Sequence, residues 1–212
     1  MQSGPRRLII FALLFAWCAA LYALRMKRAH DSAFSFVPWN MLLAAIPAIA
    51  AAIFVRAHHG FVLAMTFIVW LLFLPNAPYL ITDFVHLEQR PYVPLWFDIA
   101  LLGSCAATGL LLAYTSTADV QVTVTRRFGK VAGWSVAIGA LLLSGFGIYL
   151  GRFLRWNSWD PVQNPRQMLE VAEVVPHTRT IAVTFVYGVG VTLGYVALRT
   201  IGATLPRERW QR

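Results

Sequence analysis

Six long apolar stretches constrain this chain more than any other feature. Each holds close to the roughly 20 residues that an α-helix needs to cross the hydrocarbon of a bilayer. None contains Arg, Lys or Glu, and the acidic residue inside them is Asp98, near the start of the fourth. The pattern predicts an all-α integral membrane protein. We expect one domain, 1–212, with six transmembrane helices at about 8–24, 37–55, 61–81, 97–117, 131–150 and 180–198.

The charge content agrees with a membrane protein. Only 13% of the 212 residues are charged, against roughly 25% in a typical globular protein. That is too few to cover the surface of a soluble domain of this size. The net charge is +9, and the basic residues cluster between the apolar stretches, where Lys and Arg anchor a protein to anionic lipid. We therefore expect the lipid bilayer as a partner and no nucleic acid.

The first apolar stretch follows Arg6 and Arg7 and so resembles a signal peptide. It is long for one, and the basic run 25–28 follows it like a stop-transfer signal, so we expect it to stay as an anchor. With the N-terminus inside, ten of the 18 Lys and Arg residues fall on the cytoplasmic side. This weak bias predicts both termini in the cytoplasm and a location in the cell membrane.

The third apolar stretch ends in the motif "FLPNAPYLITDFVHL", residues 73–87. Pro78 removes a backbone donor and clashes with the preceding turn, so we expect the span to break near Pro75–Pro78. Asn76 is a favourable N-cap for a new helix over 79–90. Such a helix would place Tyr79, Asp83 and His86 along one stripe. Backbone freed by a break must be satisfied by protein or by a water-filled cavity, which predicts a pocket at the membrane edge.

A second polar motif, "GRFLRWNSWDPVQNP", follows the fifth apolar stretch at 151–165. Two crossings separate the two motifs, so they lie on the same side of the membrane and can meet. We expect a carboxylate of Asp83, Asp98 or Asp160 within salt-bridge reach of Arg152 or Arg155, with His86 lining the same cavity. The candidate ligand-binding residues are Asn76, Tyr79, Asp83, His86, Asp98, Arg152, Arg155, Asn157 and Asp160.

Three further features complete the expected architecture. Beyond Asn164, apolar residues at helical spacing predict a short amphipathic interfacial helix between spans five and six. Gly190 and Gly194 permit close helix packing within the bundle, with a homo-oligomer as the alternative. Cys18 and Cys105 lie inside apolar stretches and are expected to act as small apolar fillers. One histidine beside scattered acids is weak evidence for zinc, so we expect no metal and no cofactor.

The motifs "LPNAPYLITDFVHL" (74–87) and "FGIYLGRFLRWNSWD" (146–160), together with the six-span plan, resemble a known family. It is the bacterial multi-pass membrane protein family catalogued as domain of unknown function 1361. The resemblance covers nearly all of the chain and implies a multi-pass membrane fold. It implies no activity, cofactor or substrate.

Three functions fit these residues. The favoured one is binding or transport of a small or lipid-linked anionic ligand, held by Arg152 and Arg155. The alternative is a membrane-embedded enzyme acting on a lipid-linked substrate, with His86 as general acid or base oriented by Asp83. The third is a structural partner subunit of a membrane complex. Binding ranks first because the chain offers no nucleophile paired with a base, no Walker loop, no GxSxG and no HExxH.

Overall fold

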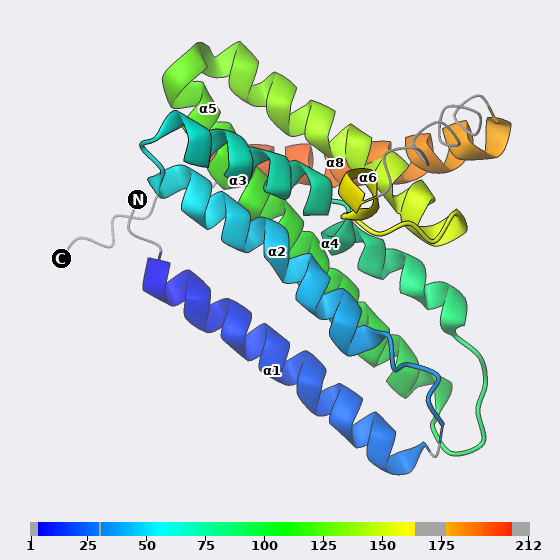
Figure 1. Ribbon diagram of the computed structural model, residues 1–212. Helices are drawn as coiled ribbons and strands as arrows, with labels where there is room; N and C mark the ends of the chain where they lie inside the picture. Colours follow the sequence, from blue (N-terminus) through cyan, green and yellow to red (C-terminus); the bar gives the residue numbers. More distant parts are fainter. Residues whose placement is uncertain (1–3, 30, 164–176, 205–212) are drawn as a thin grey trace.

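The structure is a computed structural model that describes residues 4–29, 31–163 and 177–204 (Figure 1). Within these ranges all regular secondary structure is helical. The first helices are α1 (Gly4–Arg28), α2 (Val37–Arg56) and α3 (Gly60–Phe73). Pro38 lies in the first turn of α2, where its missing N–H has no partner to lose. Each of these helices overlaps one of the first three apolar stretches.

The longest element is α5 (Leu95–Phe153), whose 59 residues contain one non-helical position. Gly129 has φ 92° and ψ 168°, a conformation that glycine adopts without a side-chain penalty. The chain reverses direction there, so the parts of α5 before and after Gly129, which we call its two arms, run antiparallel (Figure 1). A single turn, α6 (Asp160–Gln163), follows, and α8 (Thr178–Thr204) completes the described chain.

Five helices in the described part are long and apolar enough to span a membrane, which identifies an all-α membrane protein. The six spanning helices expected from the sequence are not confirmed, because the predicted stretches 97–117 and 131–150 lie in the two arms of α5, which are joined at Gly129. The five are Gly4–Arg28, Val37–Arg56, Gly60–His86, Leu95–Phe153 and Thr180–Gly202.

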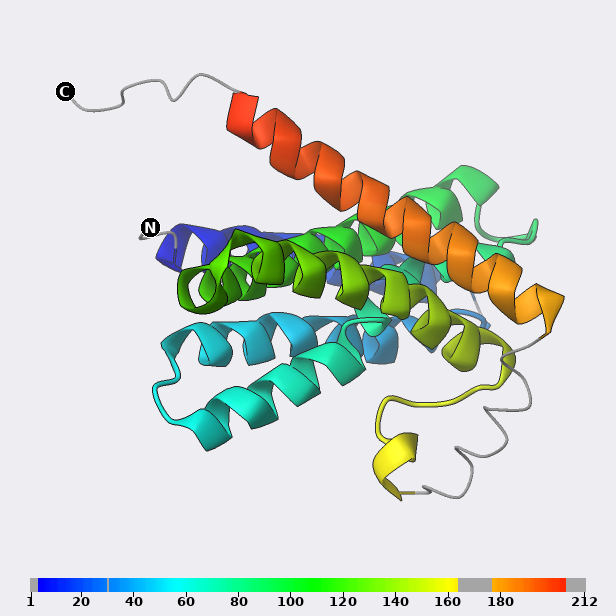
Figure 2. The ribbon, with the colours of Figure 1, turned by 90° about the horizontal axis from the view of Figure 1, so that it is seen from above.

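The bundle is built around α5. Seen from above, α8 crosses one side of α5, while α2 and α3 lie on the other (Figure 2). The crossing with α8 is close: a Cβ added at Gly145 would lie 2.2 Å from the Thr184 carbonyl oxygen and 2.6 Å from the Gly188 nitrogen. These glycines therefore let the two backbones touch.

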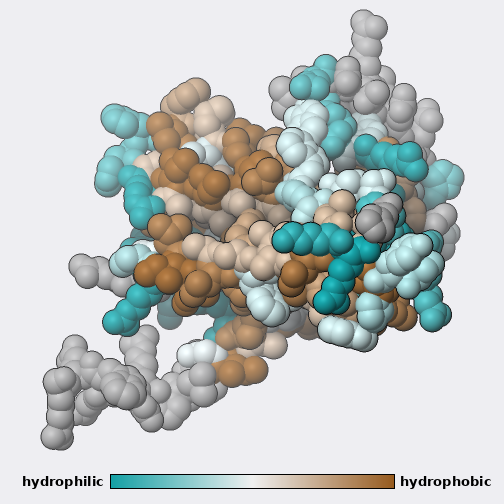
Figure 3. Space-filling view, turned by 90° about the horizontal axis from the view of Figure 1, so that it is seen from below, coloured by the Kyte–Doolittle hydropathy of each residue, from teal (hydrophilic) through white to brown (hydrophobic). Residues whose placement is uncertain are grey.

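The outer surface is strongly apolar. Leu8, Phe61, Phe185 and Val186 are among the exposed large hydrophobic side chains, with 66–75% of their surface accessible. On the face shown in Figure 3, hydrophobic side chains occupy the middle and hydrophilic ones gather towards both sides. Apolar exposure on this scale is typical of a protein whose surroundings are lipid.

Candidate functional site

The connections after α1, after the third spanning segment and after α5 meet at one end of the bundle, which we call the loop end (Figure 1). The sequence predicted only that the connections after the third and fifth apolar stretches lie on the same side of the membrane. The connection after α1 obeys the same rule, since it too follows an odd-numbered crossing. It brings the first turn of α2 to the loop end, and with it Trp39 and Asn40.

The broken span lies where the sequence places it. α3 ends at Phe73, and the single-turn helix α4 (Asn76–Tyr79) leads into a 3-10 helix, η1 (Leu80–His86), that carries Asp83 and His86. The sequence predicted an α-helix for this last piece. A 3-10 helix repeats every three residues, so the side chains of Asp83 and His86 follow one another along its surface.

Asn76 does not cap the new helix as expected. Its side-chain Nδ2 instead donates to the Phe73 carbonyl oxygen at 3.1 Å and to the Ser158 hydroxyl at 2.6 Å. The Ala77 amide bonds to the Leu74 carbonyl, so the Phe73 carbonyl needs this other donor. Asn76 therefore satisfies the broken end of α3 and ties it to the segment after α5.

Three glycines of α5 pack against the broken segment of the third span, and we call this glycine surface the seat of the break. A Cβ added at Gly147 would lie 2.4 Å from Pro75 Cγ, and one added at Gly109 would lie 2.2 Å from the Ala77 carbonyl oxygen. Gly151 similarly faces the Tyr79 ring at 3.3 Å. The break is thus held between the two arms of α5, where larger residues would displace it.

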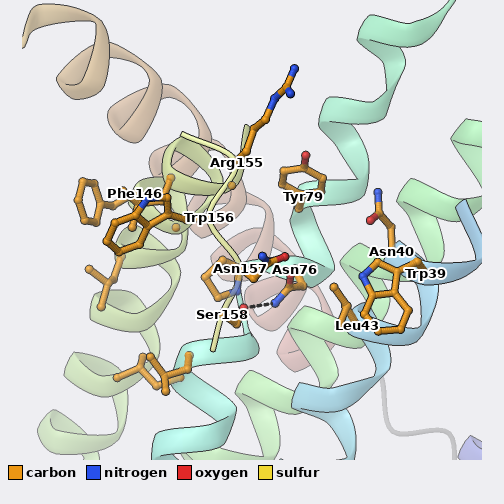
Figure 4. A pocket seen from close by; sticks show the side chains of 17 residues that line it. Trp39, Asn40, Leu43, Asn76, Tyr79, Phe146, Arg155, Trp156, Asn157 and Ser158 are labelled. Atoms are coloured by element: carbon orange, nitrogen blue, oxygen red, sulfur yellow. Dashed lines mark hydrogen bonds between the residues drawn. The ribbon is translucent and has the colours of Figure 1, made fainter. Parts of the chain in front are cut away.

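Beside this seat lies a cavity of about 510 Å³, within the range of roughly 300–1,000 Å³ typical of small-molecule sites. α2 forms one wall, and the end of α5 with the segment after it forms the opposite one (Figure 4). Trp39 of α2 meets Trp159 edge-to-face, with ring centroids 6.3 Å apart. The lining residues are Trp39, Asn40, Leu43, Leu71, Leu72, Pro75, Asn76, Tyr79, Leu143, Phe146, Gly147, Leu150, Gly151, Arg155, Trp156, Asn157 and Ser158.

Arg155 places a positive charge at the rim of this cavity, where its guanidinium points away from the other lining side chains (Figure 4). It is exposed and forms no ion pair within the described residues. Its φ of 58° is the only positive φ of a non-glycine residue in the described chain. A left-handed residue other than glycine costs about 1–2 kcal/mol, and such strain concentrates at functional sites.

Asp83, His86 and Arg152 form a cluster beside the cavity. Arg152 Nη1 lies 4.0 Å from Asp83 Oδ1, and both Arg152 Nη atoms lie 3.2 Å from His86 Nε2. The buried Asp83 carboxylate also accepts from Asn40 Nδ2 at 3.2 and 3.5 Å. The expected contact between an acid and an arginine is therefore present. His86, however, does not line the cavity, because its ring is held by Arg152 and lies 4.7 Å from Phe36.

Asp98 lies in a different cluster, which the sequence analysis missed. Its carboxylate accepts from Arg25 Nε at 3.0 Å, and both side chains are fully buried. Arg25 also reaches Asp31 at 2.9 Å and stacks over the Phe34 ring at 4.1 Å. The hydrogen bond from Arg25 lowers the pKa of Asp31 to about 2. Asp98 thus joins α1 to α5 instead of meeting Arg152 or Arg155.

The remaining candidates divide between the cavity and its surroundings. Asn76, Tyr79, Arg155 and Asn157 line the cavity. Asp160 does not pair with an arginine within the described residues, since its Oδ2 accepts from the Asn157 backbone at 2.6 Å. The roles assigned to all of these residues stay predictions. Asn40, Trp39 and Ser158 were missed, although Asn40 and Ser158 are polar residues in or next to connections that follow odd-numbered crossings.

Two other expectations have different outcomes. The amphipathic helix predicted beyond Asn164 falls on 164–176, outside the described residues. Gly194 packs against Tyr114, whose hydroxyl oxygen would lie 2.3 Å from an added Cβ, while Gly190 faces open space. This supports close packing within the bundle at Gly194, and an oligomer through both glycines stays a prediction.

Comparison with known protein families gives a match over most of the chain. The model of a family described as "Protein of unknown function (DUF1361)" matches residues 39–195. This range contains the broken span, both arms of α5 and every residue that lines the cavity. No curated protein and no solved structure matches the chain.

Proposed function

This chain belongs to the DUF1361 family of proteins of unknown function, and we propose that its cavity binds or transports an anionic ligand, small or lipid-linked. A lipid-linked ligand fits best. The supporting observation is the mixed lining of the cavity. Leucine side chains and Phe146 line it together with one cationic side chain, Arg155, and with amide and hydroxyl groups. An amphiphile carries both apolar and polar groups.

The charge of Arg155 selects the head group. Its guanidinium is available to a ligand, because it has no acidic partner within the described residues. A guanidinium binds carboxylate and phosphate oxygens through paired hydrogen bonds. The positive charge of Arg155 also favours an anionic ligand over a cationic one. Arg152 plays a different part, since it is engaged by Asp83 and His86.

The acid–base enzyme receives less support from this geometry. His86 and Asp83 lie outside the cavity lining, and no hydrogen bond joins them within the described chain. His86 Nε2 is engaged by Arg152 at 3.2 Å, whereas a general base must reach the proton that it removes.

The proposal includes a topology. The chain reverses at Gly129, and each arm of α5 contains one of the apolar stretches 97–117 and 131–150, each about as long as a bilayer crossing requires. We therefore propose that α5 crosses twice, which gives six crossings in one domain. The start of α1 and the end of α8 lie at the same end of the bundle (Figures 1 and 2). We place that end in the cytoplasm of a bacterial cell and the loop end outside the cell membrane.

The test measures the thermal unfolding of the purified protein in dodecyl maltoside. Cys18 and Cys105 are free and buried, so a thiol-reactive dye reports unfolding. Short-chain phosphatidylglycerol should raise Tm in the wild type and in Arg126→Gln, an exposed control near the turn of α5. It should not do so in Arg155→Gln. Inorganic phosphate, the second probe, raises Tm only if the ligand is a small anion. Equal responses of Arg155→Gln and wild type to every probe would refute the proposal.

A further inference from the structure

Two asparagines that line the cavity already donate hydrogen bonds to protein atoms through their side-chain amino groups. Asn40 Nδ2 donates to the Asp83 carboxylate at 3.2 and 3.5 Å. Asn76 Nδ2 donates to the Phe73 carbonyl and to the Ser158 hydroxyl. An asparagine amide has two N–H donors and one acceptor oxygen. Once the amino group is used, the oxygen is what remains for a ligand.

The orientation of Asn40 is fixed from behind. Asp83 is only 2% exposed, and its carboxylate accepts hydrogen bonds but does not donate them. A flipped Asn40 amide would set its oxygen against this carboxylate, which is unfavourable for both. Arg152 keeps Asp83 in place from the other side at 4.0 Å. Asn40, on the α2 wall of the cavity (Figure 4), therefore offers an acceptor.

Asn157 has a similar arrangement. Its Nδ2 lies 3.4 Å from Asp160 Oδ2, the oxygen that also accepts from its backbone N–H. No protein partner is found for the side-chain oxygens of Asn40, Asn76 and Asn157 within the described residues. The lining of the cavity thus combines one cationic donor at its rim, Arg155, with three amide acceptors.

These acceptors restrict the head group. A phosphate diester offers only acceptor oxygens, which suit Arg155 but gain nothing from an amide oxygen. A ligand that satisfies both must carry donors beside its anionic group. An ammonium group is a poor choice, because no Asp or Glu is among the lining residues and Arg155 would repel it. Hydroxyl groups provide neutral donors.

We therefore propose that the ligand is an anionic lipid whose head group carries hydroxyls, such as a polyol or sugar phosphate. This inference rests on the proposed function. In it, Arg155 recognises the charge, and the asparagine oxygens recognise the hydroxyls. The buried Asp83 acts as a positioning residue that turns the Asn40 amide towards the ligand.

The experiment compares two probes of equal charge. Short-chain phosphatidylglycerol carries two head-group hydroxyls, and phosphatidylmethanol carries none. Their affinities are measured by native mass spectrometry of the purified protein in detergent. We expect phosphatidylglycerol to bind roughly three- to tenfold more tightly, as one or two neutral hydrogen bonds would give. Phosphatidylethanolamine, a third probe, should bind more weakly than phosphatidylglycerol.

Variants separate the two recognition elements. Asn40→Leu should bring the ratio of the affinities for phosphatidylglycerol and phosphatidylmethanol close to one. If Asn40→Leu does not fold, Asn157→Leu, at an exposed position, tests the same ratio. Gln89→Leu, exposed and outside the cavity lining, should leave it unchanged. Arg155→Gln should weaken both anionic lipids equally.

Equal affinity of the two anionic lipids, both dependent on Arg155, would overturn the hydroxyl preference and leave the proposed function intact. Tighter binding of phosphatidylethanolamine would overturn it in favour of an ammonium group. Binding of neither anionic lipid in an Arg155-dependent manner would overturn the hydroxyl preference. It would overturn the proposed function as well if inorganic phosphate also has no Arg155-dependent effect on Tm.

Discussion

At the scale of single residues, Arg155 combines a strained backbone with an exposed charge. It lies just beyond the end of α5, and the Trp156 amide bonds back to the Leu150 carbonyl at 3.1 Å. Helices that end in this way usually place glycine at the left-handed position. Any residue other than glycine is therefore unfavourable for folding at this position, and the presence of an arginine there supports a role in binding.

The first prediction follows from this strain. Arg155→Gly should raise the free energy of unfolding by roughly 1 kcal/mol, because glycine adopts a positive φ without a clash. The same variant should lose the stabilisation by phosphatidylglycerol. Arg155→Gln is the control: it keeps the strain and loses only the charge, so its Tm without lipid should match the wild type. A lower Tm for Arg155→Gly would show that the side chain stabilises the fold.

The second prediction concerns pH. The pKa of Asp31 is lowered to about 2 by its hydrogen bond from Arg25. Its stabilising contribution is therefore complete above about pH 4, near the pKa of an unfolded aspartate, and is lost as pH falls towards 2. Asp31→Asn should be less stable than the wild type at pH 5, and the difference in Tm should close at pH 2. A difference that does not change with pH would exclude the ion pair as its cause.

At the scale of elements, the break depends on a complementary surface of α5. Gly147 receives Pro75, and Gly109 receives the Ala77 carbonyl. The position of the break could be predicted because proline acts locally on its own helix. The partner glycines could not be assigned, because their role depends on which faces of α5 meet the break. Close approach of a backbone is a tertiary property that spacing alone does not show.

The third prediction tests this seat. Gly147→Ala would place a Cβ 2.4 Å from Pro75 Cγ and should destabilise the protein by about 1–3 kcal/mol through overpacking. Gly139→Ala, in the same arm of α5 but with nothing within 4 Å, is the matched control. It should be neutral or stabilising by up to about 1 kcal/mol, since alanine favours helix. Equal effects of the two changes on Tm would refute the seat.

At the scale of the whole molecule, hydropathy predicted the helical membrane fold well. The apolar stretches are long, and the parity of crossings correctly predicted that 73–87 and the described part of the second motif, 151–163, lie at one end. The partner of Asp98 was not predicted. Arg25 was assigned to a basic run that marks the membrane edge, whereas tertiary packing buries it completely. Hydropathy predicts where a residue lies along the membrane normal. It does not predict which helices lie beside it in the plane of the membrane.

The fourth prediction is the topology. Reporter fusions after Arg56, after Lys130 and at the C-terminus should report the cytoplasm, and fusions after Arg90 and Asn164 should report the opposite side. These positions follow from six crossings and from the weak excess of Lys and Arg on the side of the N-terminus. A reversed pattern at all five would change only the orientation. Fusions after Arg90 and Asn164 that report opposite sides would contradict two crossings by α5.

The pairing of Arg25 with Asp98 also affects the order in which the helices pack together as the chain is synthesised. The two residues are 73 positions apart, so at roughly 5–20 residues per second the ribosome needs about 4–15 seconds to make the partner. During this interval α1 is already available for insertion, while its arginine can meet Asp31 but not its fully buried partner Asp98. A long basic side chain can wait in the head-group layer, and it withdraws into the protein only when α5 emerges. The first helix to be synthesised is therefore a late one to dock.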